Sequence, residues 1–323
     1  MIYTLNLNPS LDKTLFFPRL VLAELNRARR VRLDVGGKGF NVSRALLALG
    51  VGSQAMGFVA GATGQYLRRK LVRLGIEADL VEVEGTSAGG TGETRSNLTV
   101  VDETTGQITK LNEPGPSITD SDVGRLLERI RERAQPGDLW VLSGRVPPGV
   151  SDELYAHIIR LVQRSGGRAL LDSSGPSLTQ GCRAAPFAIK PNVEEAGEVV
   201  GQELTTEPDL RGAIHAFWRM GIELVALSRG AQGAIVGRRG RIVSAHPPQV
   251  AVKSPIGAGD AFLAGVIFAL TLGLDLDGIA RWAVATGTAA AMQEGTGVGK
   301  EEEVRNLVRK IRTQRLIADE GVM

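Results

Sequence analysis

Several residue types that particular kinds of site require are scarce in this sequence. One cysteine and three histidines occur among 323 residues, which excludes a disulfide framework and a cysteine-rich zinc site. Aromatic residues make up 4% of the chain, too few for a stacking surface that binds single-stranded nucleic acid. The formal net charge is only +3, and basic residues are interspersed with acidic ones, as from Arg125 to Arg133. We therefore expect no nucleic-acid partner.

Long apolar runs are absent as well. Every apolar stretch is interrupted within roughly a dozen residues, which is too short to cross a membrane. The first ten residues, MIYTLNLNPS, do not combine a basic start, an apolar stretch and a cleavage site. We expect a cytoplasmic protein with no membrane partner. The apolar fraction of 43%, beside 23% charged residues, is typical of a globular protein with a substantial core.

Short β-rich runs alternate with longer stretches of helical period along the chain. This alternation predicts an α/β fold, in which helices cover both faces of a mostly parallel sheet. No repeat or Pro/Ser-rich linker divides the sequence, so we expect one domain over residues 1–323. The expected strands are Ile2 to Leu7, Gln54 to Phe58, Leu139 to Leu142, Ala169 to Asp172, Phe187 to Lys190 and Leu224 to Ser228. The expected helices are Phe40 to Leu49, Gln65 to Leu74, Asp120 to Arg133, Asp152 to Arg164, Asp209 to Met220, Ala258 to Leu272 and Gly278 to Met292.

Two stretches, residues 11–34 and 95–111, interrupt this alternation. The second alternates in polarity from Ser96 to Val100 and then turns at Thr105-Gly106. Hairpin-like excursions do not fit the interior of a parallel sheet. We expect them to form a small antiparallel lid over one end of the sheet, where it would cover a site.

Glycine is abundant, with 41 residues, and the most informative glycines lie in Ser254 to Phe262, SPIGAGDAF. This segment follows a strand-like run, Val250 to Val252, and opens an apolar helix. The N–H groups and the dipole at a helix N-terminus form an anion site. Asp260 in this turn either caps the helix or is a general base that takes a hydroxyl proton during phosphoryl transfer. A dinucleotide fingerprint fits worse, because Phe262 stands at its third glycine.

A second glycine cluster, Gly36 to Asn41 (GGKGFN), opens another helix. Its glycines allow a ligand to approach the backbone closely, and Lys38 and Asn41 offer donors to a polyol or a phosphate. The alternative is a tight turn with a surface lysine. Asp12 follows the first strand, at the sheet edge where α/β proteins bind ligands. It could accept hydrogen bonds from sugar hydroxyls, and an Asx turn after Pro9 explains it equally well.

Two further segments follow predicted strands. In Lys190 to Glu195, the lysine suits a phosphate, and Asn192 with Glu195 either forms a capping box or holds a hydrated Mg²⁺. In Ser228 to Gly233, the glycines allow a nucleotide to lie against the backbone, and a hairpin turn explains them nearly as well. The histidines and the cysteine stand in unrelated contexts and are expected to be structural, namely His157, His215, His246 and Cys182.

The order of these motifs resembles that of the ribokinase-like carbohydrate kinases, in their phosphofructokinase B branch. The resemblance covers nearly the whole chain, and the ordered series is far more specific than any single motif. The matching segments are NPSLD (Asn8 to Asp12), GGKGFN (Gly36 to Asn41), TRSN (Thr94 to Asn97), KLNEPGP (Lys110 to Pro116), SGRVPPG (Ser143 to Gly149), LDSSG (Leu171 to Gly175), KPNVEE (Lys190 to Glu195) and GAGD (Gly257 to Asp260).

The resemblance implies a ribokinase-like three-layer α/β/α fold with a β-sheet lid that often pairs two subunits, so a homodimer is expected. It also implies transfer of the γ-phosphoryl group of ATP, with Mg²⁺, to a hydroxyl of a sugar phosphate. Asp260 would be the general base. The N–H groups of Gly257, Ala258 and Gly259 would form the anion hole.

The remaining matched positions divide between the two substrates. Those on the sugar side are Asp12, Gly37, Lys38, Asn41 and Ser143, with Arg95 on the phosphate. Arg27 would reach the same phosphate, either in its own subunit or across a dimer. Those on the ATP side are Lys190, Asn192, Ser228, Gly230, Gly233 and Thr288, with Glu195 and Asn192 linked to Mg²⁺.

Two positions depart from the pattern of the branch. Arg145 stands where a serine is usual, and Pro255 precedes Ile256 where a threonine or valine is common. Arg145 either adds a phosphate contact or points outward. The resemblance favours fructose 1-phosphate as the acceptor, then tagatose 6-phosphate, then fructose 6-phosphate. A catalytically silent sensor of sugar phosphate or nucleotide is the alternative of a different class.

Overall fold

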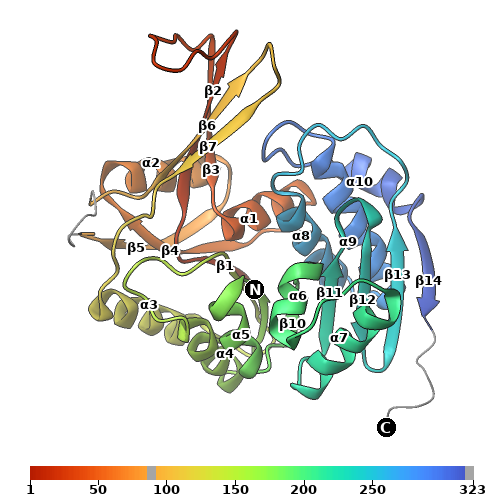
Figure 1. Cartoon of the computed structure of the whole chain (residues 1–323). Helices are drawn as coiled ribbons and strands as arrows, with labels where there is room; N and C mark the ends of the chain where they lie inside the picture. The colour runs from red at the N-terminus through yellow and green to blue at the C-terminus, as the bar shows by residue number, and fades with distance from the viewer. Residues whose placement is uncertain (86–91, 317–323) are drawn as a thin grey trace.

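The computed structural model describes residues 1–85 and 92–316 and contains a large and a small sheet (Figure 1). The strands of the large sheet are β1 (Ile2–Asn6), β4 (Gln54–Ala60), β5 (Glu77–Val83), β8 (Leu139–Ser143), β9 (Arg168–Asp172), β10 (Ala188–Ile189), β11 (Leu224–Ser228), β12 (Ala234–Arg238), β13 (Arg241–His246) and β14 (Arg312–Leu316). Their order is β14-β13-β12-β11-β10-β9-β8-β1-β4-β5. The strands from β11 to β5 are parallel, and β12, β13 and β14 extend the sheet antiparallel.

Helices cover both faces of this sheet. They are α1 (Lys38–Ala48), α2 (Gly61–Arg73), α3 (Asp120–Arg133), α4 (Leu154–Arg164), α5 (Gly175–Arg183), α6 (Val193–Val200), α7 (Glu207–Arg219), α8 (Ala258–Thr271), α9 (Leu276–Ala291) and α10 (Glu301–Val308). Trp140 and Leu142 of β8 join the core formed with α3 to α7. Val141, between them, joins the core formed with α1, α8, α9 and α10. This alternation confirms the three-layer α/β/α fold.

Most of the predicted elements occur within a few residues of the expected bounds. The strand expected at Val250 to Val252 is wrong, because this segment has no regular structure. Prolines at 247, 248 and 255 remove backbone donors there. The N–H groups of Lys253 and Ser254 instead donate to the carbonyl of Ala291 at the end of α9. This contact holds the segment that leads into α8.

The small sheet is the predicted lid, and its strands are β2 (Ser10–Phe17), β3 (Arg30–Gly36), β6 (Ser96–Asp102) and β7 (Ile108–Asn112). Their order is β3-β2-β6-β7. The pairs β2–β3 and β6–β7 are antiparallel hairpins, but β2 and β6 run parallel. The expectation of a wholly antiparallel lid is therefore wrong, because both hairpins leave the body in the same direction with their first strands adjacent. The lid projects from the body beside α1 (Figure 1).

Within the described part of the chain, no helix is long and apolar enough to cross a membrane.

Candidate active site

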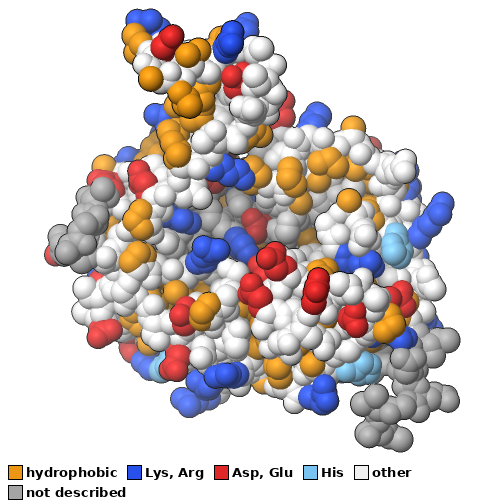
Figure 2. Space-filling model, in the orientation of Figure 1, with side chains coloured by type: hydrophobic (Ala, Val, Ile, Leu, Met, Phe, Trp, Pro, Cys, Tyr) orange, Lys and Arg blue, Asp and Glu red, His pale blue; other side chains and the backbone are white. Residues whose placement is uncertain are grey.

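Polar side chains at the carboxyl ends of the parallel strands meet at one edge of the large sheet. Asn6 ends β1, Ser143 ends β8, Asp172 ends β9, and Lys190 follows β10. All four residues are buried. Ligands of open α/β sheets bind at this edge. The surface is hollowed there, below the lid (Figure 2).

The glycine turn before α8 presents Asp260 to this edge. Gly257 precedes the helix with φ 79°, a left-handed conformation that favours glycine. Ala258 and Gly259 form the first turn, in which helical N–H groups lack partners inside the helix; the N–H of Ala258 donates to Pro255 O at 3.3 Å. Asp260 does not cap the helix. Its Oδ2 accepts a hydrogen bond of 2.8 Å from Nδ2 of Asn41, so the capping interpretation is wrong.

The surroundings of Asp260 make its carboxylate a better base. Burial and then the charge of Asp172 raise the pKa of Asp260 to about 6, against the lowering effects of Asn41, Lys38 and Lys190. A carboxyl group with a pKa near neutrality is suited to take a proton from a hydroxyl.

Asp172 binds two lysines, Lys38 and Lys190, for which the family resemblance implies different substrates. Its Oδ1 lies 3.0 Å from Nζ of Lys38 and 3.3 Å from Nζ of Lys190. Burial alone would raise the pKa of Asp172, but Lys190 and Lys38 hold it below its ordinary value. The charge of Asp172 in turn raises the pKa of Lys38. Lys38 is thus held in an ion pair rather than free on the surface.

Sequence reasoning missed Asp172 as a site residue. The motif LDSSG was recognised, but no role was given to its carboxylate. The signal was present, because Asp172 ends a predicted strand at the ligand-binding edge. Its ion pairs span 134 residues of sequence in the case of Lys38, so no local pattern revealed them.

A cavity of about 750 Å³ opens between the lid and the strand ends, and Gly37, Lys38, Arg95 and Arg145 contribute to its wall. Gly37 has φ 112°, and a Cβ there would lie 1.7 Å from Nδ2 of Asn6, so only glycine fits. Three of these four wall residues, Lys38, Arg95 and Arg145, carry a positive charge. The cavity therefore suits an anionic ligand.

Several buried polar atoms at the strand ends and in the cavity wall have no hydrogen-bond partner among the described residues. Those of wall residues are Nδ2 of Asn6, Oδ1 of Asn8, Nε of Arg95 and Oδ1 of Asn97. Oγ of Ser143, at the end of β8, is unpartnered as well. Buried polar groups in native proteins are rarely left unsatisfied. These atoms are therefore candidates to bind a ligand that supplies the missing partners.

Asp12 lies in β2 at the base of the lid. Its Oδ1 accepts hydrogen bonds from Oγ of Ser10 at 2.7 Å and Nδ2 of Asn97 at 3.0 Å. Burial raises the pKa of Asp12, and these two hydrogen bonds lower it. Because Asp12 belongs to a strand, the Asx-turn interpretation is wrong. Its carboxylate lies beside the cavity, since Asn97 also contributes to the cavity wall.

Arg27 is a predicted site residue that lies far from the cavity of its own chain. It lies in the exposed loop between β2 and β3. This loop is at the far end of the lid (Figure 1). The register pairs Ser10 with Gly36 near the body and Phe16 with Arg30 near that loop. Six residue-to-residue steps along β2 separate these ends, a distance of about 20 Å. Any contact of Arg27 with substrate would need a second subunit.

The positions predicted for ATP have local structural roles. Asn192 and Glu195 form the capping box of α6, with hydrogen bonds of 2.8 and 2.9 Å. Ser228 ends β11, and an isolated bridge pairs it with Asn192, so the two segments are adjacent. Thr288 donates to Val284 O within α9. Gly230 and Gly233 lie in the turn of the β11–β12 hairpin.

These local roles agree with the simpler interpretations of both segments, and nucleotide binding there stays a prediction. Two observations place the segments near the glycine turn and the cavity under the lid. The capping-box residues border a cavity of about 480 Å³ that shares Arg145 with the cavity under the lid. Nζ of Lys190 lies 3.8 Å from the position of a Cβ on Gly259, beside the glycine turn.

Known proteins share these features. Residues 6–303 match the pfkB family of carbohydrate kinases. The 1-phosphofructokinase of Rhodobacter capsulatus is 34% identical over 316 residues, which cover 98% of this chain and 98% of that protein. A tagatose-6-phosphate kinase of Staphylococcus epidermidis is 31% identical, over 92% of this chain and 94% of that protein.

The similarity extends to solved structures. Phosphofructokinase-2 from Escherichia coli, in complex with fructose-6-phosphate, matches with a TM-score of 0.87 and 30% identity, over 96% of this chain and 98% of that chain. The order of sequence motifs, the three-layer fold with its lid and the glycine turn bearing Asp260 thus have one common explanation. The chain belongs to the pfkB family of carbohydrate kinases.

Proposed function

We propose that this kinase transfers the γ-phosphoryl group of ATP to fructose 1-phosphate and forms fructose 1,6-bisphosphate. The observation that carries the proposal is Asp260, a buried carboxylate with a pKa of about 6 at the start of α8. Relatives of matching length named 1-phosphofructokinase support fructose 1-phosphate as the acceptor. Relatives named tagatose-6-phosphate kinase make tagatose 6-phosphate the second candidate.

The acceptor would bind in the cavity under the lid. Asp12 and Asn41 offer an acceptor and a donor to sugar hydroxyls, and the unpartnered Oγ of Ser143 offers another contact. Arg95 and Lys38 would bind the phosphate of the sugar. The cavity wall holds three cations with Arg145, which is more than a neutral sugar needs. Charge-assisted hydrogen bonds to phosphate are about twice as strong as neutral ones.

In the proposed step, the acceptor oxygen attacks the γ-phosphorus as Asp260 takes the hydroxyl proton. The bond from the γ-phosphorus to the β–γ bridging oxygen breaks, and ADP leaves with that electron pair. The N–H groups of Gly257, Ala258 and Gly259 would stabilise the negative charge on the phosphoryl oxygens. The lid would exclude water, which would otherwise accept the phosphoryl group.

ATP would lie over the β10 and β11 ends, with Lys190 near its phosphates and Asn192, Ser228, Gly230, Gly233 and Thr288 around the nucleotide. Glu195 and Asn192 fit a hydrated Mg²⁺ rather than a directly bound ion, because one oxygen of each already belongs to the capping box. Among the described residues, no group of three acidic, histidine or cysteine side chains forms a metal cluster. A bound Mg²⁺ would neutralise phosphate charge.

The lid also supports a homodimer. The strand register places Leu15, Val31, Leu98, Val100 and Leu111 on one face of the small sheet. Val31 is 52% exposed and Leu111 is 54% exposed, and an apolar sheet face normally packs against another surface. A second lid would cover this face. Sedimentation should give a dimer for the natural chain and a monomer for Leu111→Glu; a natural chain that stays monomeric at high concentration contradicts the dimer.

The activity is tested by measuring kcat/KM of the purified enzyme with three acceptors at saturating MgATP. We expect the highest value with fructose 1-phosphate, then tagatose 6-phosphate and fructose 6-phosphate. Turnover of tagatose 6-phosphate without turnover of fructose 1-phosphate would reverse the order. No turnover with any acceptor, beside clear thermal stabilisation by the same ligands, would indicate a sensor instead.

Arg145 is expected to contribute to the binding of the sugar phosphate. It lines the acceptor cavity with Arg95. Burial lowers the pKa of Arg95, Asp12 raises it, and the charge of Arg145 lowers it further. A dianionic phosphate would relieve this repulsion. Arg145→Ser should raise KM for the sugar phosphate about tenfold, as the loss of one charge-assisted hydrogen bond predicts. KM for ATP is the internal control, and an unchanged sugar-phosphate KM would show that Arg145 points outward.

A further inference from the structure

We infer that Arg44 is a positioning residue that holds the amide of Asn41 in the one orientation that serves Asp260. Arg44 lies on α1, one helical turn after Asn41, and neither motif comparison nor sequence pattern gave it a role. The inference rests on the proposed role of Asp260 as the general base. It adds a residue outside the substrate-binding set to the machinery of that base.

Two hydrogen bonds connect Arg44 to the base through Asn41, and a third anchors Arg44 to Thr296. Nη1 of Arg44 donates to Oδ1 of Asn41 at 3.4 Å and to Oγ1 of Thr296 at 3.0 Å. Nδ2 of the same Asn41 donates to Oδ2 of Asp260 at 2.8 Å. The two ends of one amide are therefore occupied by a cation on one side and the catalytic carboxylate on the other.

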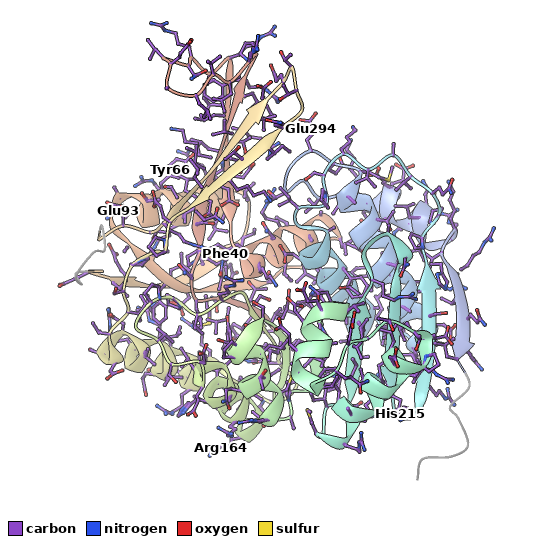
Figure 3. The ribbon with its side chains drawn as sticks, viewed as in Figure 1. Phe40, Tyr66, Glu93, Arg164, His215 and Glu294 are labelled. Atoms are coloured by element: carbon purple, nitrogen blue, oxygen red, sulfur yellow. The ribbon has the colours of Figure 1, made fainter. Side chains whose placement is uncertain are left out.

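The anchor of Arg44 is itself close to the glycine turn. Thr296 follows α9, and its Cα lies 3.6 Å from the position of a Cβ on Gly257. The loop that carries Thr296 also meets the lid, where Arg30 forms an ion pair of 3.8 Å with Glu294. Glu294 lies beside the lid strands in Figure 3. The guanidinium of Arg44 is thus held between the helix that bears Asn41 and the loop beside the anion hole.

The environment of Arg44 is costly for a side chain without a function. Burial lowers the pKa of Arg44, and Asp34 and Asp12 raise it while Arg32 lowers it. An arginine stays charged in a protein under these conditions. A half-buried cation that donates to neutral oxygens, rather than to a carboxylate, is unusual. Its two acceptors indicate that its task is to orient neutral groups.

The orientation matters because Asp260 changes its protonation state during the reaction. An ionised Asp260 accepts from Nδ2 of Asn41. Once protonated, Asp260 could instead donate to Oδ1 of Asn41 if the amide turned over. That alternative would stabilise the protonated carboxyl and raise its pKa. With Oδ1 bound to the cation, Arg44 prevents the reversal, so Asn41 favours only the basic form of Asp260.

The other charged groups that face Asp260 are Asp172 from β9, Lys38 from α1 and Lys190 after β10. They remain in an Arg44 variant. A change in the pKa of Asp260 in such a variant therefore has one of two causes. Either the positive charge of Arg44 is lost, or the amide of Asn41 has turned over. A double-mutant cycle with Asn41 separates these two causes.

The test compares pH profiles of kcat/KM for Arg44→Met, Asn41→Ala and the double variant, with one substrate throughout so that its own titration cancels. Arg44→Met should lower kcat about tenfold at neutral pH and move the acid limb upward by about half a pH unit or more, with KM for ATP within about twofold. In the Asn41→Ala background, the same substitution should move the limb no further. Arg69→Met, at an exposed position of α2, is the control and should match the natural enzyme.

Two results would overturn the inference. An equal shift of the limb in both backgrounds would mean that Arg44 acts by its charge alone. A lower melting temperature with an unchanged limb and kcat would mean that it is structural. Should Arg44→Met fail to fold, Thr296→Val removes the anchor of the guanidinium and should give a smaller shift in the same direction. Full activity of Asp260→Asn would instead refute the base itself.

Discussion

Asp260→Asn is expected to lower kcat at least 100-fold while the protein remains folded. The substitution keeps the size of the side chain but removes the group that takes the hydroxyl proton, and general base catalysis contributes about 10²- to 10⁴-fold. Because Asp260 lies in the first turn of α8 without capping it, the helix loses no capping bond. Steady-state turnover and circular dichroism measure the two parts of this expectation.

A matched control is Asp277→Asn. Asp277 also lies in the first turn of a helix, α9, and forms only a partly exposed ion pair with Arg315 at 3.8 Å. Such pairs contribute about 0 to 1 kcal/mol, so this variant should turn over at the natural rate. Turnover of Asp260→Asn within a few fold of the natural enzyme would refute the assigned base.

Asp172→Ala is expected to reduce both stability and activity. The carboxylate is buried and bound to two lysines, of which Lys190 is 5% exposed and Lys38 is 38% exposed. Removal of one partner from a buried ion pair costs about 3–5 kcal/mol, and the partial exposure of Lys38 places the expected loss near the lower end. Activity should fall with it, because both lysines face the site. Chemical denaturation and kcat/KM measure the two losses.

The stabilisation of the fold by the ion pairs of Asp172 should weaken as the pH falls. The pKa of Asp172 is lower in the folded protein than its ordinary value. The ion pairs therefore stabilise the fold at neutral pH, and their contribution is lost as the pH falls through the lowered pKa. The difference in stability between the natural chain and Asp172→Ala should narrow at acid pH.

Asp79→Ala is the control for Asp172. Asp79 also bridges two cations, Arg129 and Arg133, each at 2.6 Å, but both arginines are more than a third exposed. Exposed pairs contribute about 0 to 1 kcal/mol each. Asp79→Ala should therefore cost much less and leave kcat/KM unchanged. Equal losses of stability and of kcat/KM in the two variants would show that the burial of Asp172 does not make its ion pairs more important than exposed ones.

The sequence predicted the elements whose signals are local. The helix from Asp120 to Arg133 begins and ends as expected, because a capping box starts it and its apolar residues follow the helical period. The glycine turn before Asp260 and the two lid excursions were found for the same reason. Glycine spacing and the alternation of polar and apolar residues in a strand can be identified within one stretch of sequence, without knowing what that stretch packs against.

Contacts between distant segments explain most of what the sequence did not reveal. The bond between Asn41 and Asp260 spans 219 residues, and the ion pair of Lys38 with Asp172 spans 134. The parallel pairing of β2 with β6 likewise joins strands far apart in sequence. Propensity and periodicity carry no information about such pairs. For that reason the ion pairs of Asp172 and the hydrogen bond of Arg44 to Thr296 were visible only in the folded chain.

The pH dependence of kcat/KM for fructose 1-phosphate tests the role of Asp260 most directly. The phosphate of the substrate titrates near pH 6 and gives one acid limb in every variant. A base with a pKa of about 6 adds a second, because activity is lost as Asp260 becomes protonated. We predict a slope of log kcat/KM near two below that pH for the natural enzyme and near one for Asp260→Asn, whereas the same slope for both proteins would contradict the account.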